Sequence, residues 1–199
     1  MNALKKKNTK IIIKYTWPIY IIVAILVSLL LRIVFGIAHP LPAYKTIYLF
    51  VSGEVINSKK LTSDLLEKYK DKELKDVSYN AVLPTDGIYE TKRSVTGYST
   101  ADILIMPDSK LVDLNVSAFA LEFDEELNTF FQGATFFVYE SLNYGIKIDK
   151  EKVKDYMTLP GDENFYMFLN ATSHNLGKYS KEQNEDHNVA LLLVNEWRA

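Results

Sequence analysis

The chain of 199 residues contains no cysteine. Disulfide bonds and an anchor on a lipid-modified cysteine are therefore excluded, so burial of apolar side chains must stabilise any folded part. The sequence also lacks the GxSxG and HExxH motifs of common hydrolases, and it has no glycine-rich loop for phosphate groups. We therefore expect no catalytic residues, no cofactor and no metal site, and we predict that the protein is not an enzyme.

Acidic residues are missing from the first 44 positions, which hold six Lys and Arg side chains. The whole chain has 23 basic and 25 acidic side chains, so residues 45–199 keep 17 basic and all 25 acidic ones, a net charge of −8. Nucleic-acid phosphates are bound by Lys and Arg, which makes an acidic domain of this kind a poor match to them. We expect no nucleic-acid binding.

One long apolar segment follows the basic tail: residues 17–38 read WPIYIIVAILVSLLLRIVFGIA. About 20 apolar residues are enough to cross a bilayer as a helix. We therefore predict a transmembrane signal-anchor helix over residues 15–38, with the lipid bilayer as its partner. The lysines of residues 1–14 favour the cytoplasmic side of a membrane. A linker over residues 39–45 would then lead to an extracellular domain, residues 46–199, of a single-pass cell-membrane protein.

A cleaved signal peptide is the alternative, because Gly36 and Ala38 are small residues at the spacing that signal peptidases recognise. The apolar run is longer than the roughly 7–15 residues of a signal peptide, which favours a retained helix. Either alternative exports the domain. Lysine, isoleucine and asparagine are abundant and arginine is scarce, which is typical of AT-rich coding. Together with the absence of cysteine, this composition predicts a low-GC Gram-positive bacterium as the source.

The first half of the exported domain alternates predicted strands and helices. Residues 46–52, TIYLFVS, have the β-branched and aromatic side chains of a strand, and an apolar stripe over residues 61–70 predicts a helix. Further strands are predicted over residues 77–82 and 101–106. The last of these is continuously apolar, as in strands that are covered on both faces. We therefore predict an α/β domain with a mixed, partly parallel sheet.

The second half of the domain has a less regular pattern. We predict the polar, hydroxyl-rich segment 88–100 to be a loop, residues 124–131 to be a short helix and residues 181–198 to be a closing helix. Short strands are predicted over residues 116–123, 136–139, 146–148 and 165–169.

Several of these segments are similar to a known family. The stretches IYLFVSGEV and ADILIMPDSKL resemble the opening lobe of bacterial extracellular solute-binding proteins of the type II periplasmic class, and residues 144–147 and 164–170 look similar to later parts. The resemblance spans most of residues 46–199 in short pieces, and it implies one lobe of such a binding protein. Two-lobed members are considerably longer than this domain. The second lobe, and with it a cleft that closes on the ligand, is therefore in doubt.

Two loops at strand ends form the candidate ligand-binding site, because open α/β sheets bind ligands beyond the carboxyl ends of their strands. The first loop contributes Ser52, Gly53 and Glu54, and Asp108 ends a later strand. The second loop, residues 91–100, offers hydroxyl, aromatic and guanidinium groups that suit a sugar, a peptide or a small anion. Alternatively, its small residues only form turns and its tyrosine packs at the core edge. The remaining predicted site residues are Arg93, Thr96, Tyr98 and Ser99.

From these observations we predict a membrane-anchored, non-catalytic, solute-binding-like domain. It would bind a small molecule or serve as an accessory of a membrane transport complex. The alternative is a cell-envelope protein that docks on another protein and binds no small ligand. A pocket between the two loops favours the first function, whereas a large exposed apolar patch favours the second. The aromatic side chains available for such a patch, if they do not fill the core, are Phe130, Phe131, Phe136, Phe137 and Tyr139.

Overall fold

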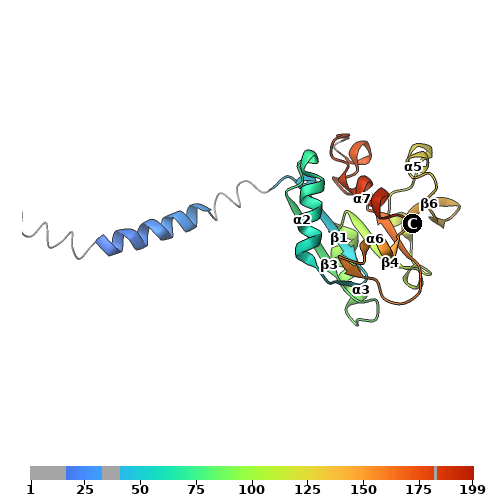
Figure 1. Cartoon of the computed structure of the whole chain (residues 1–199), viewed down its shortest axis with the longest axis horizontal. Coiled ribbons are helices and arrows are strands. Elements are labelled where there is room, and N and C mark those ends of the chain that lie inside the picture. The colour runs from blue at the N-terminus through green and yellow to red at the C-terminus, as the bar shows by residue number, and fades with distance from the viewer. Residues whose placement is uncertain (1–16, 33–40, 182) are drawn as a thin grey trace, which may run out of the picture. The chain divides into compact units, whose positions relative to one another are not determined.

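The computed structural model describes residues 17–32, 41–181 and 183–199. The chain divides into two units, residues 1–41 and residues 42–199 (Figure 1). Each unit is described here by itself. All the strands that the structure describes belong to the second unit.

The first unit contributes one helix to the described residues, over residues 17–32. Among the residues that the structure describes, no helix is both long enough and apolar enough to span a membrane. This finding contradicts the predicted transmembrane helix over residues 15–38 and the predicted single-pass location in a cell membrane. The basic tail, residues 15, 16 and 33–38 of the predicted helix, and residues 39 and 40 of the predicted linker lie outside the described residues.

A six-stranded mixed sheet forms the centre of residues 42–199, with the strand order β3-β1-β4-β8-β6-β5. Its parallel half consists of β1 (Thr46–Val51) between β3 (Asp76–Ala81) and β4 (Ile103–Pro107). In register, Ile47 lies beside Val77 of β3, and Leu49 lies beside Ile103 of β4. The predicted α/β fold with a mixed, partly parallel sheet is therefore confirmed.

The antiparallel half of the sheet continues from β4. The strand β8 (Phe165–Leu169) pairs with β4, β6 (Leu142–Lys147) pairs with β8, and β5 (Phe136–Tyr139) forms the edge. Two residues of β2 (Glu54–Val55) and two of β7 (Met157–Thr158) form a separate small antiparallel ladder.

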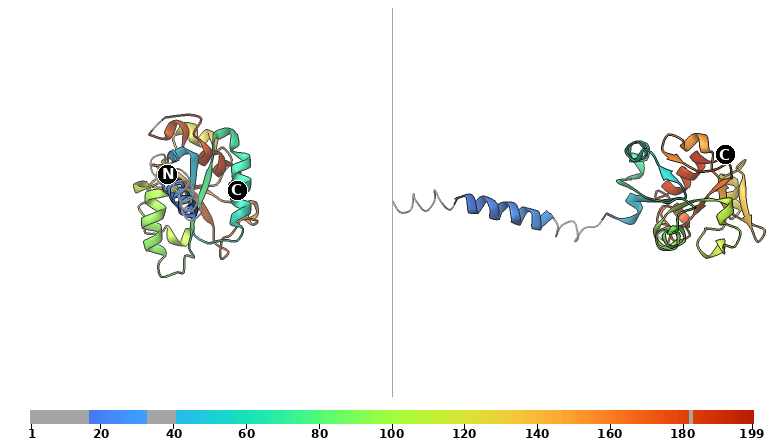
Figure 2. Two further views of the ribbon diagram at one scale, coloured as in Figure 1. Left: turned by 90° about the vertical axis from the view of Figure 1, so that its left-hand side faces the viewer. Right: turned by 90° about the horizontal axis from the view of Figure 1, so that it is seen from below.

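Helices cover both faces of the sheet, and β1 has buried side chains on each face, because successive side chains of a strand point to opposite sides. Ile47, Leu49 and Val51 pack in one core cluster, together with α2 (Ser58–Lys68) and α7 (Val189–Trp197). Phe50 packs in a second cluster on the opposite face, which contains Tyr89 of α3 (Tyr89–Lys92). The right-hand view of Figure 2 shows the teal helix α2 and the green helical segment that begins with α3 on opposite sides of the sheet.

The segment 88–100, predicted to be a loop, is helical. It forms α3, a π-helix η3 (Arg93–Gly97) and α4 (Tyr98–Thr100). Its hydroxyl groups bond to the backbone one turn back: Thr96 Oγ1 donates to the Lys92 carbonyl at 2.7 Å, and Thr100 Oγ1 to the Thr96 carbonyl at 2.6 Å. The same hydroxyls that suggested a loop are therefore used within a helix.

Two predictions in the second half are also wrong. Residues 116–123 contain the short 3₁₀ helix η5 (Val116–Ala118) instead of a strand, because Val116 and Phe119, three positions apart, are both buried on the same face. The closing helix begins at Val189, not at residue 181. Before this helix, the Gly177 N–H donates to the His187 carbonyl at 2.7 Å. This hydrogen bond holds the residues just before the helix against the segment around Gly177.

The remaining elements are short. The helix α5 (Glu125–Phe130) is capped by Asp124, whose Oδ1 accepts from the Leu127 N–H at 2.8 Å. The other short helical segments are η1 (Ala43–Lys45), η2 (Lys70–Lys72), η4 (Asp108–Lys110), α6 (Lys150–Val153) and η6 (Gly177–Tyr179).

A buried polar network closes the sheet at the amino ends of the parallel strands. Asp102, just before β4, accepts a hydrogen bond from the Tyr48 N–H at 2.7 Å and another from the Ser173 hydroxyl. Asn175 donates its Nδ2 to the Thr46 carbonyl at 2.9 Å. Burial raises the pKa of the Asp102 carboxyl, which the hydrogen bond from Ser173 partly offsets.

Candidate functional site

A groove of about 590 Å³ lies at the carboxyl ends of β1 and β3. The connection that leaves β1 leads to α2 on one face of the sheet, and the one that leaves β3 leads to α3 on the other. The groove therefore lies at the carboxyl-end edge of the sheet, where open α/β sheets bind their ligands. The volume lies within the roughly 300–1,000 Å³ of small-molecule sites.

The first wall of the groove is formed by Gly53, Glu54 and Val55. A Cβ atom on Gly53 would lie 2.4 Å from the Thr158 carbonyl oxygen, a distance at which the backbone must move. Glycine at this position therefore permits the close approach of two backbones that pairs β2 with β7. The pairing leaves the Glu54 side chain exposed along the groove.

The second wall follows β3 and the start of α3. Asp86 Oδ1 accepts a hydrogen bond from the Ile88 N–H at 3.1 Å, which fixes the turn before α3. Ile88 and Lys92 are one helical turn apart, and both line the groove. In the described part of the chain, Glu54, Asp86 and Lys92 form no ion pair. The groove therefore offers two carboxylates, one ammonium group and an apolar side chain to a ligand.

A buried polar network supports α3 from the side that faces the sheet. The hydroxyl groups of Ser52 and Tyr89 share a hydrogen bond of 2.7 Å. The Arg93 guanidinium lies 5.6 Å from the centre of the Tyr89 ring and 5.6 Å from that of Tyr98, within the range of a cation–π contact. It also pairs with Glu90. These contacts hold α3 in the orientation that places Ile88 and Lys92 in the groove.

Two atoms of this network have no hydrogen-bond partner among the described residues: Arg93 Nε and Tyr98 Oη. The Tyr98 ring stacks on Phe119 with 4.4 Å between ring centres. Burial raises the pKa of Tyr98 to about 12, although the positive charge of Arg93 opposes the shift. The phenol therefore stays neutral over the physiological pH range.

The structure divides the predicted site residues into three groups. Gly53 and Glu54 line the groove. Ser52, Arg93 and Tyr98 belong to the network behind it, so they support the groove and do not line it. The other three, Thr96, Ser99 and Asp108, do not line the groove and lie outside this network.

The hydroxyls of Thr96 and Ser99 bond to backbone carbonyls one turn back, those of Lys92 and Val95. They serve the helical segment and not the groove. Asp108 begins η4 after β4, and its N–H donates to the Asn164 carbonyl at 2.9 Å. Its side chain is exposed and does not line the groove.

Sequence reasoning missed Asp86, Ile88, Tyr89 and Lys92. The sequence of residues 84–87 indicates a turn and gives no sign of a ligand site. The one available signal was the spacing of Ile88 and Lys92, which at i and i+4 fall on the same face of a helix. Among the described residues, no group of three or more His, Asp or Glu side chains is placed to hold a metal ion.

Comparison with known proteins adds no relative: no protein-family model, no curated protein and no solved structure matches the chain.

Proposed function

We propose that residues 42–199 form a non-catalytic binding domain that holds a small solute in the groove at the carboxyl ends of β1 and β3. The observation that carries this proposal is the groove itself, in which Glu54, Asp86 and Lys92 form no ion pair with any residue that the structure describes. The resemblance of the sequence to one lobe of a solute-binding protein supports the same function, and it too is a proposal.

The chemistry of the walls favours a solute that has both donor and acceptor groups. The carboxylates of Glu54 and Asp86 accept hydrogen bonds, and the ammonium group of Lys92 donates them. Val82 and Ile88 add apolar surface beside these groups. A sugar or an amino acid matches this combination, because each has several hydrogen-bonding groups next to an apolar face.

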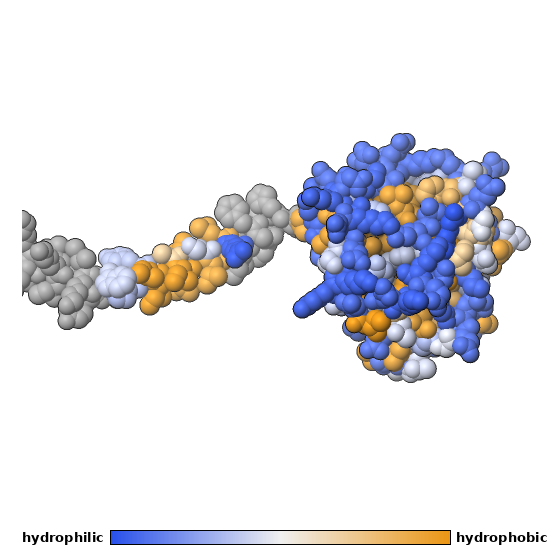
Figure 3. Space-filling model, in the orientation of Figure 1, coloured by the Kyte–Doolittle hydropathy of each residue, from blue (hydrophilic) through white to orange (hydrophobic). Residues whose placement is uncertain are grey.

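Docking of another protein is a second candidate function, favoured by apolar side chains at the rim of the groove. Leu83 is 45% exposed and Ile88 is 52% exposed. The aromatic side chains considered for such a patch are mostly packed: Phe131 is fully buried, Phe136, Phe137 and Tyr139 are half-buried, and Phe130 is 43% exposed. The face of the domain in Figure 3 is mostly hydrophilic, with small and separate apolar patches. We therefore rank docking below solute binding.

A thermal-shift screen of the full chain against sugars, amino acids, short peptides and nucleotides tests the proposal. A ligand at about 100 times its dissociation constant stabilises the folded state by about 2.7 kcal/mol. Each kcal/mol raises the melting temperature by about 2–4 °C for a protein of this size. The shift should be lost in Glu54→Gln and Lys92→Ala.

The matched control is Glu67→Gln, which changes an exposed carboxylate on α2 away from the groove and should keep the shift. A cooperatively unfolding protein that responds to no compound would count against solute binding. A compound whose shift survives in both groove variants would place its site elsewhere.

A further inference from the structure

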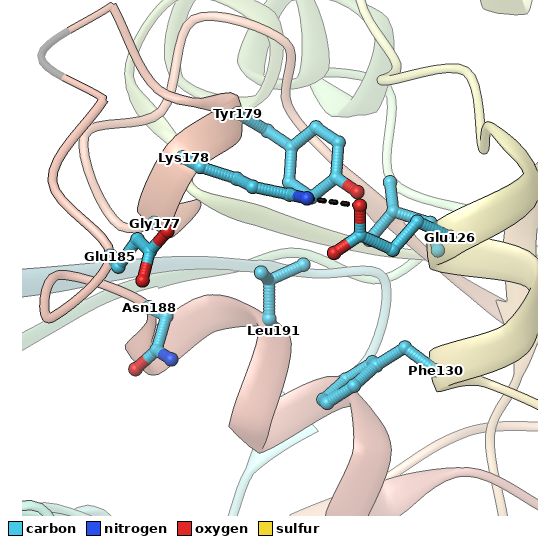
Figure 4. A pocket seen from close by; sticks show the side chains of 9 residues that line it. Glu126, Phe130, Gly177, Lys178, Tyr179, Glu185, Asn188 and Leu191 are labelled. Carbon is cyan, nitrogen blue, oxygen red and sulfur yellow. Dashed lines mark hydrogen bonds and ion pairs between the residues drawn. The ribbon is translucent and has the colours of Figure 1, made fainter.

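A second pocket, of about 240 Å³, lies between α5, η6 and the start of α7 (Figure 4). It shares no lining residue with the groove. The loop before η6 is attached at the amino end of β1, where Asn175 donates to the Thr46 carbonyl. This pocket, which we call the α5–α7 pocket, is therefore on the side of the sheet opposite to the carboxyl ends that form the groove.

The floor of the α5–α7 pocket is apolar. Leu191 of α7 and Leu127 of α5 are buried, and Phe130 is 43% exposed. Phe130 stands nearly perpendicular to Phe131, with 4.8 Å between ring centres and an angle of 78°, so its position is fixed by packing. Figure 4 shows Phe130 and Leu191 at the base of the pocket. An exposed aromatic ring beside a leucine is suited to receive an apolar group of a ligand.

The polar side of the pocket has more negative than positive charge. Lys178 forms an ion pair with Glu126 across the upper edge, and the hydrogen bond that its ammonium group donates to that carboxylate raises the pKa of Lys178 (Figure 4). The one ammonium group among the lining residues is thus already paired. The Glu185 carboxylate forms no ion pair within the part of the chain that the structure describes. In Figure 4 it lies on the side of the pocket opposite to Phe130.

We propose that the α5–α7 pocket binds a small organic amine. Glu185 pairs with the protonated amine, and Phe130 and Leu191 contact the apolar body of the ligand. A carboxylate ligand would meet Glu185 and Glu126 with only a paired lysine to offset them, so an anion is disfavoured. The volume is below the range of drug-sized sites, which limits the ligand to about one ring and a short chain. This inference does not depend on the proposed function of the groove.

Titration of the isotope-labelled full chain with 2-phenylethylamine at neutral pH, followed by amide NMR, tests this inference. We expect saturable shifts in the amides of α5, η6 and the start of α7. Phenylacetate, which replaces the cation with an anion on the same ring, should bind at least about tenfold more weakly, since an ion-paired hydrogen bond contributes about 1.5–3 kcal/mol.

Two variants sharpen the test. Glu185→Gln removes the charge and should weaken 2-phenylethylamine binding about tenfold, and Phe130→Ala should weaken it by a similar factor. Glu125→Gln, on the same helix but outside the pocket, is the matched control and should bind as the unchanged chain does.

Three results would overturn the inference: no saturable shift, equal binding of phenylacetate, or undiminished binding by Glu185→Gln. A fourth such result is a set of shifts confined to residues 53–55 and 79–92, because it would assign the amine to the groove instead. Because the two sets of amides are separate, failure of one site is distinguishable from failure of the other.

Discussion

The two ends of the parallel strands differ in how their carboxylates are placed. At the amino ends, Asp102 is buried and accepts hydrogen bonds from the Tyr48 N–H and the Ser173 hydroxyl. At the carboxyl ends, Glu54 and Asp86 are exposed and form no ion pair among the described residues. Both ends of the sheet thus have carboxylates, but Asp102 is buried and joins two segments of the fold, whereas the hydrogen bond that Asp86 accepts comes from the Ile88 N–H of its own turn. A buried carboxylate with two donors stabilises the connection of neighbouring segments, while unpaired exposed ones are available to a ligand. The difference separates a structural end of the sheet from a candidate functional end.

The largest effect should come from breaking the structural end. Asp102→Ala leaves the Tyr48 N–H and the Ser173 hydroxyl without their acceptor. Each unsatisfied buried group costs about 1–3 kcal/mol, so we expect the free energy of unfolding to fall by about 3 kcal/mol. Urea denaturation measures the change. Asp108→Ala, at the exposed carboxyl end, is the control and should stay within about 0.5 kcal/mol. Equal losses in the two variants would remove the distinction between the ends.

A smaller loss is expected at the wall of the groove. Gly53→Ala places a Cβ atom 2.4 Å from the Thr158 carbonyl oxygen, so β2 and β7 must separate. Forcing an extra carbon into a packed region costs about 1–3 kcal/mol. Gly87 has no atom within 4 Å of a built Cβ, which makes Gly87→Ala a matched control with little or no loss. Denaturation of both variants checks the difference, and a Gly53→Ala protein as stable as Gly87→Ala would contradict the close packing.

The same comparison explains which parts of the fold and of the candidate site can be predicted from the sequence. Strands such as Thr46–Val51 and Phe165–Leu169 follow from their own composition, so they were predicted within a residue or so. Gly53 and Glu54 are predicted as site residues because a loop after a strand of an α/β sheet is a general ligand position, and both line the groove. The segment 88–100 was mistaken because its hydroxyls satisfy a helix internally, which composition does not reveal. The partner of Ser52 was missed for another reason: Tyr89 is 37 residues away in the chain, and only the fold brings the two hydroxyls together.

The support behind the groove should show coupling of about 1 kcal/mol. Ser52→Ala leaves the Tyr89 hydroxyl without its partner, and Tyr89→Phe does the same to Ser52. Each single variant should lose about 1–2 kcal/mol, while the double variant should lose much less than the sum, because no unpaired hydroxyl remains. A double-mutant cycle of unfolding free energies measures the coupling. Strictly additive losses would show that the two hydroxyls do not act together.

The smallest effect has the opposite sign. Tyr98 Oη is buried with no partner among the described residues, so Tyr98→Phe should stabilise the protein at neutral pH by about 0.5–1 kcal/mol. Burial raises the pKa of Tyr98 to about 12. Between the ordinary pKa of a tyrosine, about 10, and that value, the unfolded chain loses the phenol proton while the folded chain keeps it. Stability therefore falls as pH rises through this range, and Tyr98→Phe should lessen the fall.

Denaturation at neutral pH and at several alkaline values measures both effects of Tyr98→Phe. Tyr48→Phe changes a tyrosine that is 43% exposed, and it should leave neutral stability within about 0.5 kcal/mol. If Tyr98→Phe instead destabilises the protein at neutral pH, the Tyr98 hydroxyl has a hydrogen-bond partner in the folded state. Arg93 or Tyr89 would supply that partner after a rearrangement of their side chains. The buried Tyr98 hydroxyl would then be paired, as the Asp102 carboxylate is at the amino ends of the parallel strands. The difference between the two ends would then be limited to the exposed carboxylates of the groove.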